Sequence, residues 1–199
     1  MTVSRSSRLL PLLLVLFVGS GCAALIYEIV WFQMLSLIVG SSAISIGVLL
    51  GTFMGGMCLG SLLLPRYVRL SEHPLRVYAL LETGIAISGI AILFGLPYAG
   101  GFYVAVGSGG FGGLLINGVF CALCLLIPTV LMGATLPAVA RWVETTPSGV
   151  SWLGFFYGGN LAGAVFGCLI TGFYLLRVHD VMFATFTAVA INVAGVVRL

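Results

Sequence analysis

The sequence contains no lysine, and only 7% of its 199 residues are charged. Soluble domains carry about 25% charged residues, so an ordinary water-exposed globular surface is excluded. Hydrophobic residues make up 61% of the chain, and apolar windows of about 20 residues recur along it, each long enough to cross a hydrocarbon core of ~30 Å. The composition therefore predicts an all-α, polytopic transmembrane helix bundle that forms one integral membrane domain, residues 1–199.

Arginine alone supplies the positive charge, and it lies in short segments between apolar runs. Such positions indicate membrane topology, so the lipid bilayer is an expected partner and nucleic acid is not. His73 and His179 lie far apart, and no Cys/His group has the spacing of a zinc site. Cys121 and Cys124 form a Cys-x-x-Cys pair, but their neighbours carry no charge that would activate a redox thiol. We therefore expect no metal, no cofactor and no catalytic triad.

Six apolar segments predict six helices, separated by short polar, glycine-rich or proline-containing breaks. The expected spans are residues 10–38, 43–64, 75–97, 112–140, 150–175 and 180–198. The first segment also has a basic start and small residues before Cys22, as secretory and lipoprotein signals do. A membrane helix is favoured over a cleaved signal, because the apolar run continues to Val39 and Gly19 stands where a lipoprotein signal normally has leucine.

The distribution of arginine sets the expected orientation. In the six-span arrangement seven arginines fall on one side of the membrane and Arg177 alone falls on the other. The seven are Arg5, Arg8, Arg66, Arg69, Arg76, Arg141 and Arg198. The positive-inside rule then predicts a multi-pass protein of the bacterial cytoplasmic (inner) membrane, with both termini in the cytoplasm.

Glycines recur every four residues in the second and fifth predicted helices. The second helix has Gly47, Gly51, Gly55, then Gly56 and Gly60; the fifth has Gly154, Gly158, then Gly159, Gly163 and Gly167. This spacing places each set on one helix face, where two backbones can approach closely. We predict helix packing at these faces, and the alternative is that they slide or gate. Because the two helices hold equivalent places in oppositely directed three-helix halves, the pattern also favours two inverted repeats.

An ionisable residue inside a membrane segment is by default a functional candidate. Glu28 lies about 27 Å along the first helix at 1.5 Å per residue, beside Tyr27 and Trp31, residue types that favour membrane interfaces. It is either an interfacial carboxylate that reaches water or a buried acid that faces the bundle. Glu82 lies about two turns into the third helix, and is either paired with an arginine near the inner interface or buried.

Amide and hydroxyl groups extend this set of candidates. Asn160 lies near the middle of the fifth helix and can hydrogen-bond across helices, as can Asn117 and Asn192. Pro128 and Pro137 are expected to interrupt the fourth helix and to free backbone carbonyl groups beside a cavity. The candidate ligand-binding residues are Glu28, Glu82, Asn160 and Thr135.

Several segments together resemble a known family. They are "GCAALIYEIVWFQMLSLIVGSS", "GGMCLGSLLLPR", "LIPTVLMGATLPAVAR" and "FYGGNLAGAVFGCLITGFYLL". In order and content they resemble the membrane region of the bacterial membrane-associated spermidine synthase-like proteins, over most of residues 20–176. The resemblance implies helices arranged somewhat like half of a major-facilitator transporter, followed in that family by a cytoplasmic aminopropyltransferase-like domain. The matching positions are Tyr27, Glu28, Trp31, Gly133, Thr135, Pro137, Arg141, Tyr157, Asn160 and Gly163.

The enzyme domain of that family has no counterpart in this sequence. There is no pattern for a Rossmann-like sheet, and "GSGG" at 107–110 is not followed by an αβ unit that would make it a cofactor loop. The chain by itself is therefore not expected to make spermidine. We expect a stand-alone membrane module, a half whose partner is a separate chain, or a protein cut at Leu199.

Two functional hypotheses follow. The first is a non-catalytic membrane module that anchors or assembles with a partner protein, or with its own copies, at the cytoplasmic face. The second is a transporter-like module that binds or moves a small, polyamine-like cation, with Glu28, Glu82 and Asn160 at one cavity. A membrane enzyme is disfavoured by the shortage of titratable residues. A buried acid that faces Asn160 or Thr135 would favour transport, whereas acids on opposite, water-exposed surfaces would favour the anchor.

Overall fold

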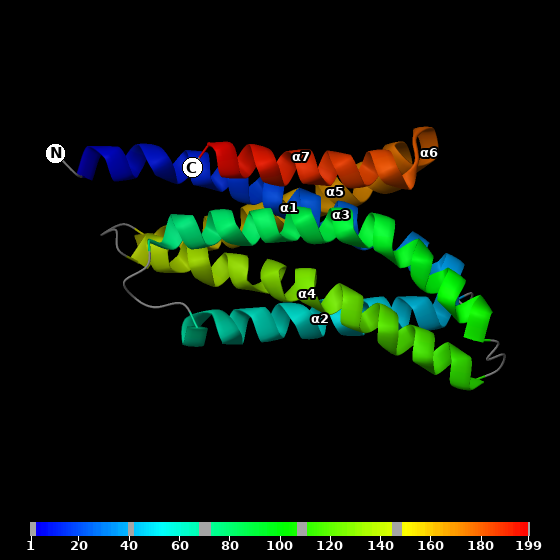
Figure 1. Cartoon of the computed structure of the whole chain (residues 1–199). Helices are drawn as coiled ribbons and strands as arrows, with labels where there is room; N and C mark the ends of the chain where they lie inside the picture. Colours follow the sequence, from blue (N-terminus) through cyan, green and yellow to red (C-terminus); the bar gives the residue numbers. More distant parts are fainter. Residues whose placement is uncertain (1–2, 40–41, 68–72, 107–110, 145–148, 199) are drawn as a thin grey trace.

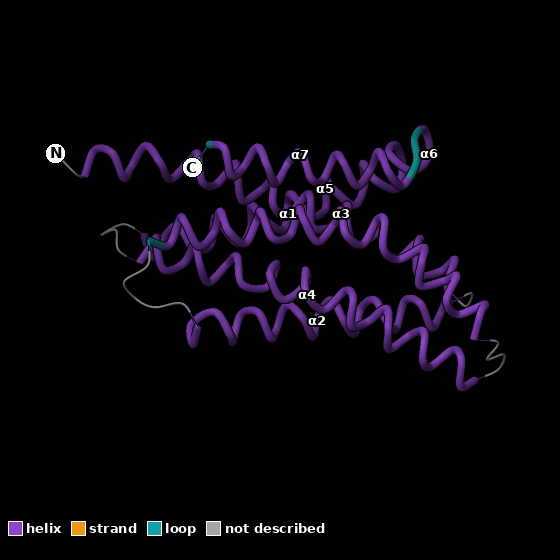
Figure 2. Tube along the Cα trace, viewed as in Figure 1, coloured by secondary structure: helices purple, strands orange, loops and turns teal. Residues whose placement is uncertain are grey.

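The computed structural model describes residues 3–39, 42–67, 73–106, 111–144 and 149–198, and these ranges are almost entirely helical, with no strand (Figures 1 and 2). The elements are α1 (Val3–Val39), α2 (Ser42–Tyr67), α3 (Pro74–Val106), α4 (Phe111–Glu144), α5 (Gly149–Ile170), a π-helical turn η1 (Thr171–Leu175), α6 (Leu176–Val178) and α7 (Val181–Val197). The predicted all-α membrane bundle is confirmed.

Five helices are long and apolar enough to cross a membrane. Their apolar spans are Leu10–Ile38, Ala43–Arg66, Pro74–Tyr98, Gly118–Val143 and Trp152–Val178. The sixth predicted span corresponds to α7, whose 17 residues lie at the short end of the range for a crossing helix. Large apolar side chains such as Leu80 and Ile87 are exposed on the outside of the bundle. These exposed side chains and long apolar helices indicate a multi-pass protein in contact with lipid.

The helices lie side by side in an elongated bundle, and both chain termini lie at the same end of it (Figure 1). α2 packs mainly against α4 and α1 against α5, while α7 lies along α1 and α3. At the end that holds the termini, the Arg141 guanidinium of α4 donates a hydrogen bond to the Pro65 carbonyl oxygen of α2 at 3.3 Å. The helix directions place Arg177, in α6, at the opposite end (Figure 1).

Glycine allows α2 and α4 to touch through their backbones. Gly60 of α2 lies against the carbonyl group of Val130, and Gly133 of α4 lies against the backbone of Met57. A Cβ atom at either glycine would overlap with these backbone atoms. Close approach of this kind is the main source of helix association in lipid, where the hydrophobic effect between helices is absent.

The same arrangement joins α1 and α5. Gly163 of α5 lies against the carbonyl group of Val18, and Gly21 of α1 lies against the backbone of Asn160. These contacts bring the middle of α5 next to the polar segment of α1, so they also position the candidate site described below.

The contacts between α1 and α5 repeat those between α4 and α2. A shift of 112 residues relates the α1 positions to α4, and a shift of 103 residues relates the α2 positions to α5. The related pairs are Val18 and Val130, Gly21 and Gly133, Met57 and Asn160, and Gly60 and Gly163. α1 and α4 run in opposite directions along the bundle (Figure 1). The two halves, α1–α3 and α4–α7, are therefore inverted relative to each other, as the glycine pattern indicated.

The glycines predicted to pack divide into two faces. Those that contact a neighbouring helix are Gly56, Gly60, Gly159, Gly163 and Gly167. Three other glycines of α2 have open space beside them, because a Cβ atom there would have no neighbour within 4 Å. These are Gly47, Gly51 and Gly55. Contrary to the prediction, this second face of α2 does not pack against any of the residues that the structure describes. A spacing of four identifies a helix face but not the direction in which that face points.

Pro128 and Pro137 do not interrupt α4, contrary to the prediction, because the helix continues through both of them. Next to Pro128, the Thr129 hydroxyl donates a hydrogen bond to the Leu125 carbonyl oxygen at 2.9 Å. Membrane helices tolerate internal proline where Ser/Thr hydroxyl groups and neighbouring helices satisfy the local backbone. Both conditions hold here, since α4 packs against α2 and α3.

Tyr27 and Trp31 are core residues, although residue type alone suggested a place at a membrane interface. Their side chains are 0% and 1% exposed, and their rings stack with centroids 5.4 Å apart. Tyr27 lies against Gly89 of α3. The preference of Tyr and Trp for interfaces applies to lipid-facing positions, whereas this face of α1 is turned into the bundle.

Asp180 caps the N-terminus of α7, because its carboxylate accepts a hydrogen bond from the Phe183 backbone N–H at 2.8 Å. Replacing Asp180 by alanine removes this acceptor and should lower the free energy of unfolding by about 1 kcal/mol. Asp180→Asn keeps an acceptor oxygen and should retain most of the stability. Thermal unfolding in detergent measures the stability of both variants. An equal loss of stability in Asp180→Ala and Asp180→Asn would contradict the capping role.

Candidate functional site

Glu82 is an acid buried inside the helix bundle, about two turns from the start of α3. Its side chain is 1% exposed, on α3. The Ser20 hydroxyl of α1 donates a hydrogen bond to its Oε1 atom at 2.6 Å. Tyr78, one turn earlier on α3, hydrogen-bonds to the same carboxyl group. The acid is therefore held between two helices by hydroxyl groups.

Of the two alternatives for Glu82, these hydrogen bonds favour the buried acid over a carboxylate paired with an arginine. Arg76, six residues earlier in the sequence, is exposed and lines a different cavity at the end of the bundle. Hydroxyl groups carry no positive charge, and an ionised carboxylate in an apolar interior is costly without a cation. The carboxyl group of Glu82 is thus suited to bind a proton or a cation.

A small cavity of about 60 Å³ lies beside Ser20, between α1, α2, α4 and α5. A cavity of this size has room for a few water-sized groups. Its polar lining comes from Ser20, Thr135 and Asn160, and apolar lining from Phe53, Met57 and Met132. The structure thus brings Thr135 and Asn160 to one cavity, and Ser20 links that cavity to Glu82.

The cavity spans the two inverted halves. Ser20 of α1 and its counterpart Met132 of α4 both line it, as do Met57 of α2 and its counterpart Asn160 of α5. Related positions from both halves therefore meet at one place. In transporters built from inverted repeats, substrate and ion sites lie near the bilayer midplane at the interface of the repeats.

Thr135 and Asn160 are fixed by hydrogen bonds to backbone carbonyl oxygens. The Asn160 amide Nδ2 donates to Phe17 of α1 at 3.1 Å, and the Thr135 hydroxyl donates to Met132 within α4 at 2.7 Å. Amide and hydroxyl side chains also carry acceptor oxygens. The polar wall of the cavity can therefore accept hydrogen bonds from a cationic N–H group.

Glu28 does not line this cavity but lies beyond it along α1. It is partly buried, and it follows the cavity-lining residues Ala24 and Leu25 by one turn of the helix. Residues three and four apart share a helix face, so Glu28 is on the cavity side of α1. It stands about two turns from Ser20, the residue to which Glu82 is bonded.

Two residues of the site, Ser20 and Tyr78, were not identified from the sequence. Tyr78 had a usable signal, because its spacing of four from Glu82 places both on one face of the third helix. Ser20 had none, since it lies between Gly19 and Gly21 and looks like part of a small-residue packing segment. Its role depends on which face of α1 meets α3.

Within the part of the chain that the structure describes, no group of three His, Cys, Asp or Glu side chains could hold a metal ion. Cys121 and Cys124 are free thiols on α4, one buried and one partly buried. Comparison with protein-family models, with curated proteins and with solved structures yields no match for this chain.

Proposed function

We propose that this protein is a transporter-type membrane module that binds an ammonium group of a small cationic solute of the polyamine class between α1, α2, α4 and α5. The observation that carries the proposal is the buried carboxyl group of Glu82, hydrogen-bonded to Ser20, a residue that lines the cavity. Acids are rare inside membrane helices and are mostly found where they serve ion or substrate pathways.

The surroundings of Glu82 support a binding role. The cavity offers acceptor oxygens from Thr135 and Asn160, and it lies where the two inverted halves meet. The hydroxyl group of Tyr27, on the same helix as Ser20, is buried with no hydrogen-bond partner among the described residues. Resemblance to the membrane region of spermidine synthase-like proteins supports a polyamine as the solute class.

A second candidate function is assembly with a partner protein or another copy of the chain. It is supported by the outward glycine faces of α2 and α5, which leave space for the close approach of another helix. These glycines are Gly47, Gly51, Gly55, Gly154 and Gly158. Affinity purification in mild detergent with mass spectrometry of bound proteins distinguishes the two, since a stoichiometric protein partner would favour assembly.

The cytoplasmic membrane of a bacterium, with both termini in the cytoplasm, is the proposed location. Arg66 and Arg141 lie near the ends of α2 and α4, at the end of the bundle that holds the termini. Positively charged residues remain preferentially on the cytoplasmic side. In this orientation Arg177, at the other end, is the exception.

Calorimetric titration of the detergent-purified protein with spermidine tests the proposed function. Glu82→Gln removes the acidic group but keeps an acceptor for Ser20, so we expect folded protein with affinity reduced about tenfold or more, equivalent to ~1.4 kcal/mol. The matched control is Asp180→Asn, which makes the same acid-to-amide change at the end of the bundle. Equal affinities of the wild type and Glu82→Gln, or no saturable binding to the wild type, would overturn the proposal.

A further inference from the structure

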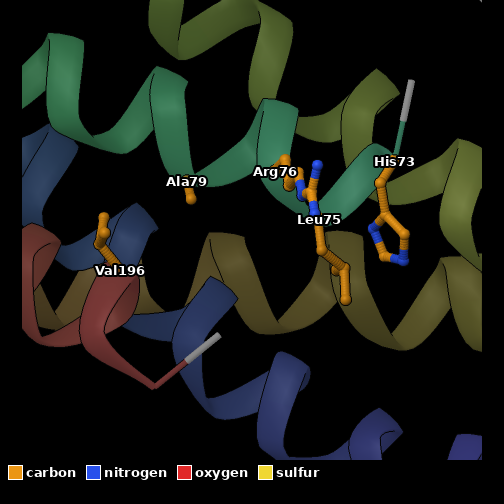
Figure 3. Close-up of a pocket in the computed structure, with 5 residues that line it drawn as sticks. All are labelled: His73, Leu75, Arg76, Ala79 and Val196. Carbon is orange, nitrogen blue, oxygen red and sulfur yellow. The ribbon is translucent and has the colours of Figure 1, made fainter.

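A second cavity, separate from the Glu82 site, lies between the start of α3 and the end of α7. Its volume is about 260 Å³, and it is lined by His73, Leu75, Arg76, Ala79 and Val196. Figure 3 shows Ala79 and Val196 facing each other from α3 and α7, with Arg76 and His73 toward the start of α3. The start of α3 and the end of α7, which carry the lining residues, lie at the end of the bundle that holds both termini (Figure 1).

One part of this cavity is suited to an anion. Arg76 carries a permanent charge and a planar fork of N–H donors that matches phosphate oxygens, and the His73 ring supplies a further N–H donor. The first turn of α3 closes on His73, whose carbonyl oxygen accepts hydrogen bonds from the backbone N–H groups of Arg76 at 3.0 Å and Val77 at 3.3 Å. The partial positive charge of this helix start adds to that of Arg76. Acidic side chains are absent from the described lining.

The other part of the cavity is apolar. Leu75, Ala79 and Val196 line it, and the neighbouring residues Leu80 and Val197 are exposed on the outside of the bundle. The cavity thus has a basic part beside an apolar part that continues into the membrane. A phospholipid has the same order of groups, with a phosphate at the membrane surface and acyl chains below it, whereas free phosphate would leave the apolar part unused.

We infer that this cavity binds the phosphate group of an anionic phospholipid, with Arg76 as its main ligand and His73 as a second donor, and with the start of the acyl chains against Ala79 and Val196. Basic pockets between transmembrane helices on the arginine-rich side bind anionic head groups in this way. The bound lipid then bridges α3 and α7, one helix from each inverted half. This site is independent of Glu82 and of any solute bound there.

The test uses the protein in nanodiscs of phosphatidylcholine mixed with phosphatidylglycerol, followed by native mass spectrometry of the lipid that stays bound. We expect the wild type to retain phosphatidylglycerol and Arg76→Gln to retain several-fold less. Arg66→Gln is the matched control, because it removes the same charge at the same end of the bundle, from a residue outside the cavity lining. Equal losses in both variants, or equal retention of both lipids by the wild type, would overturn the inference.

Two further measurements distinguish loss of the lipid site from loss of folding, and a lipid ligand from free phosphate. Arg76→Lys keeps the charge without the planar fork, so intermediate retention supports the site even where Arg76→Gln does not fold. Inorganic phosphate is titrated into lipid-free protein in detergent, with the thermal unfolding temperature as readout. An increase that depends on Arg76 would show that free phosphate is the ligand and would overturn the lipid assignment. Spermidine affinity of Arg76→Gln should equal that of the wild type, which separates this site from the proposed solute site.

Discussion

Alanine at Gly163 should destabilise the protein, whereas alanine at Gly158, on the same helix, should not. A Cβ atom at Gly163 would overlap with the Val18 carbonyl group of α1, but a Cβ atom at Gly158 would meet no atom within 4 Å. Overpacking at a close contact costs about 1–3 kcal/mol. At an open helix position the same substitution is neutral or stabilises by up to ~1 kcal/mol.

A second pair of variants repeats this experiment in the other half of the chain. Gly60→Ala corresponds to the destabilising change, and Gly55→Ala corresponds to the neutral one. Thermal unfolding in detergent, followed by circular dichroism, gives the stability of all four variants. If both members of a pair lost the same stability, the close backbone contacts would not be the interactions that hold α1 to α5 and α2 to α4.

Replacing Glu82 by leucine should lower the free energy of unfolding more than replacing it by glutamine. Leucine fits an apolar interior, but it removes the carboxyl group that accepts the Ser20 hydroxyl and to which Tyr78 is hydrogen-bonded. A buried polar group that loses its hydrogen bond costs about 1–3 kcal/mol. Glutamine keeps an acceptor oxygen for Ser20, so its loss should be the smaller one while spermidine binding is still reduced.

A double-mutant cycle separates the hydrogen bond from the effect of side-chain size. Ser20→Ala in the Glu82→Leu background removes a hydroxyl group that has lost its carboxyl acceptor, so part of the lost stability should return. Denaturant or thermal unfolding of the wild type, both single variants and the double variant measures the coupling. Additive effects would mean that the 2.6 Å contact between Ser20 and Glu82 contributes nothing to stability.

The helices could be predicted from the sequence because each depends on local composition. An apolar run of sufficient length predicts a crossing helix wherever it lies. The breaks place several ends within a few residues, but α1 begins at Val3 instead of residue 10 and α3 continues to Val106 instead of ending at residue 97. The inverted relation of the halves was also visible, because four-residue glycine spacing occurs in the second helix of each half. Both features need no knowledge of tertiary contacts.

The rotation of each helix about its own axis could not be predicted, and the errors follow from this. Residue type suggested an interface for Tyr27 and Trp31, which face the core, and Gly47 was placed in a contact although it faces outward. Glu82 was identified as a candidate, but its partner Ser20 was not. Rotation is decided by contacts between helices distant in the sequence, and an almost uniformly apolar helix gives little indication of its buried side.

The interleaving of the two halves also determines the order in which the bundle can assemble. The main partner of α1 is α5, and the main partner of α2 is α4, so the earliest helices to enter the membrane pair with later ones. During synthesis α2 has no main packing partner until α4 is inserted. α1 lacks its main partner for longer, and its backbone at Val18 and Gly21 is without the contact to α5 until α5 is inserted. The contact between α1 and α5 thus closes around the segment that carries Ser20, before α7 is added, and the cavity beside it exists only once translation has passed α5.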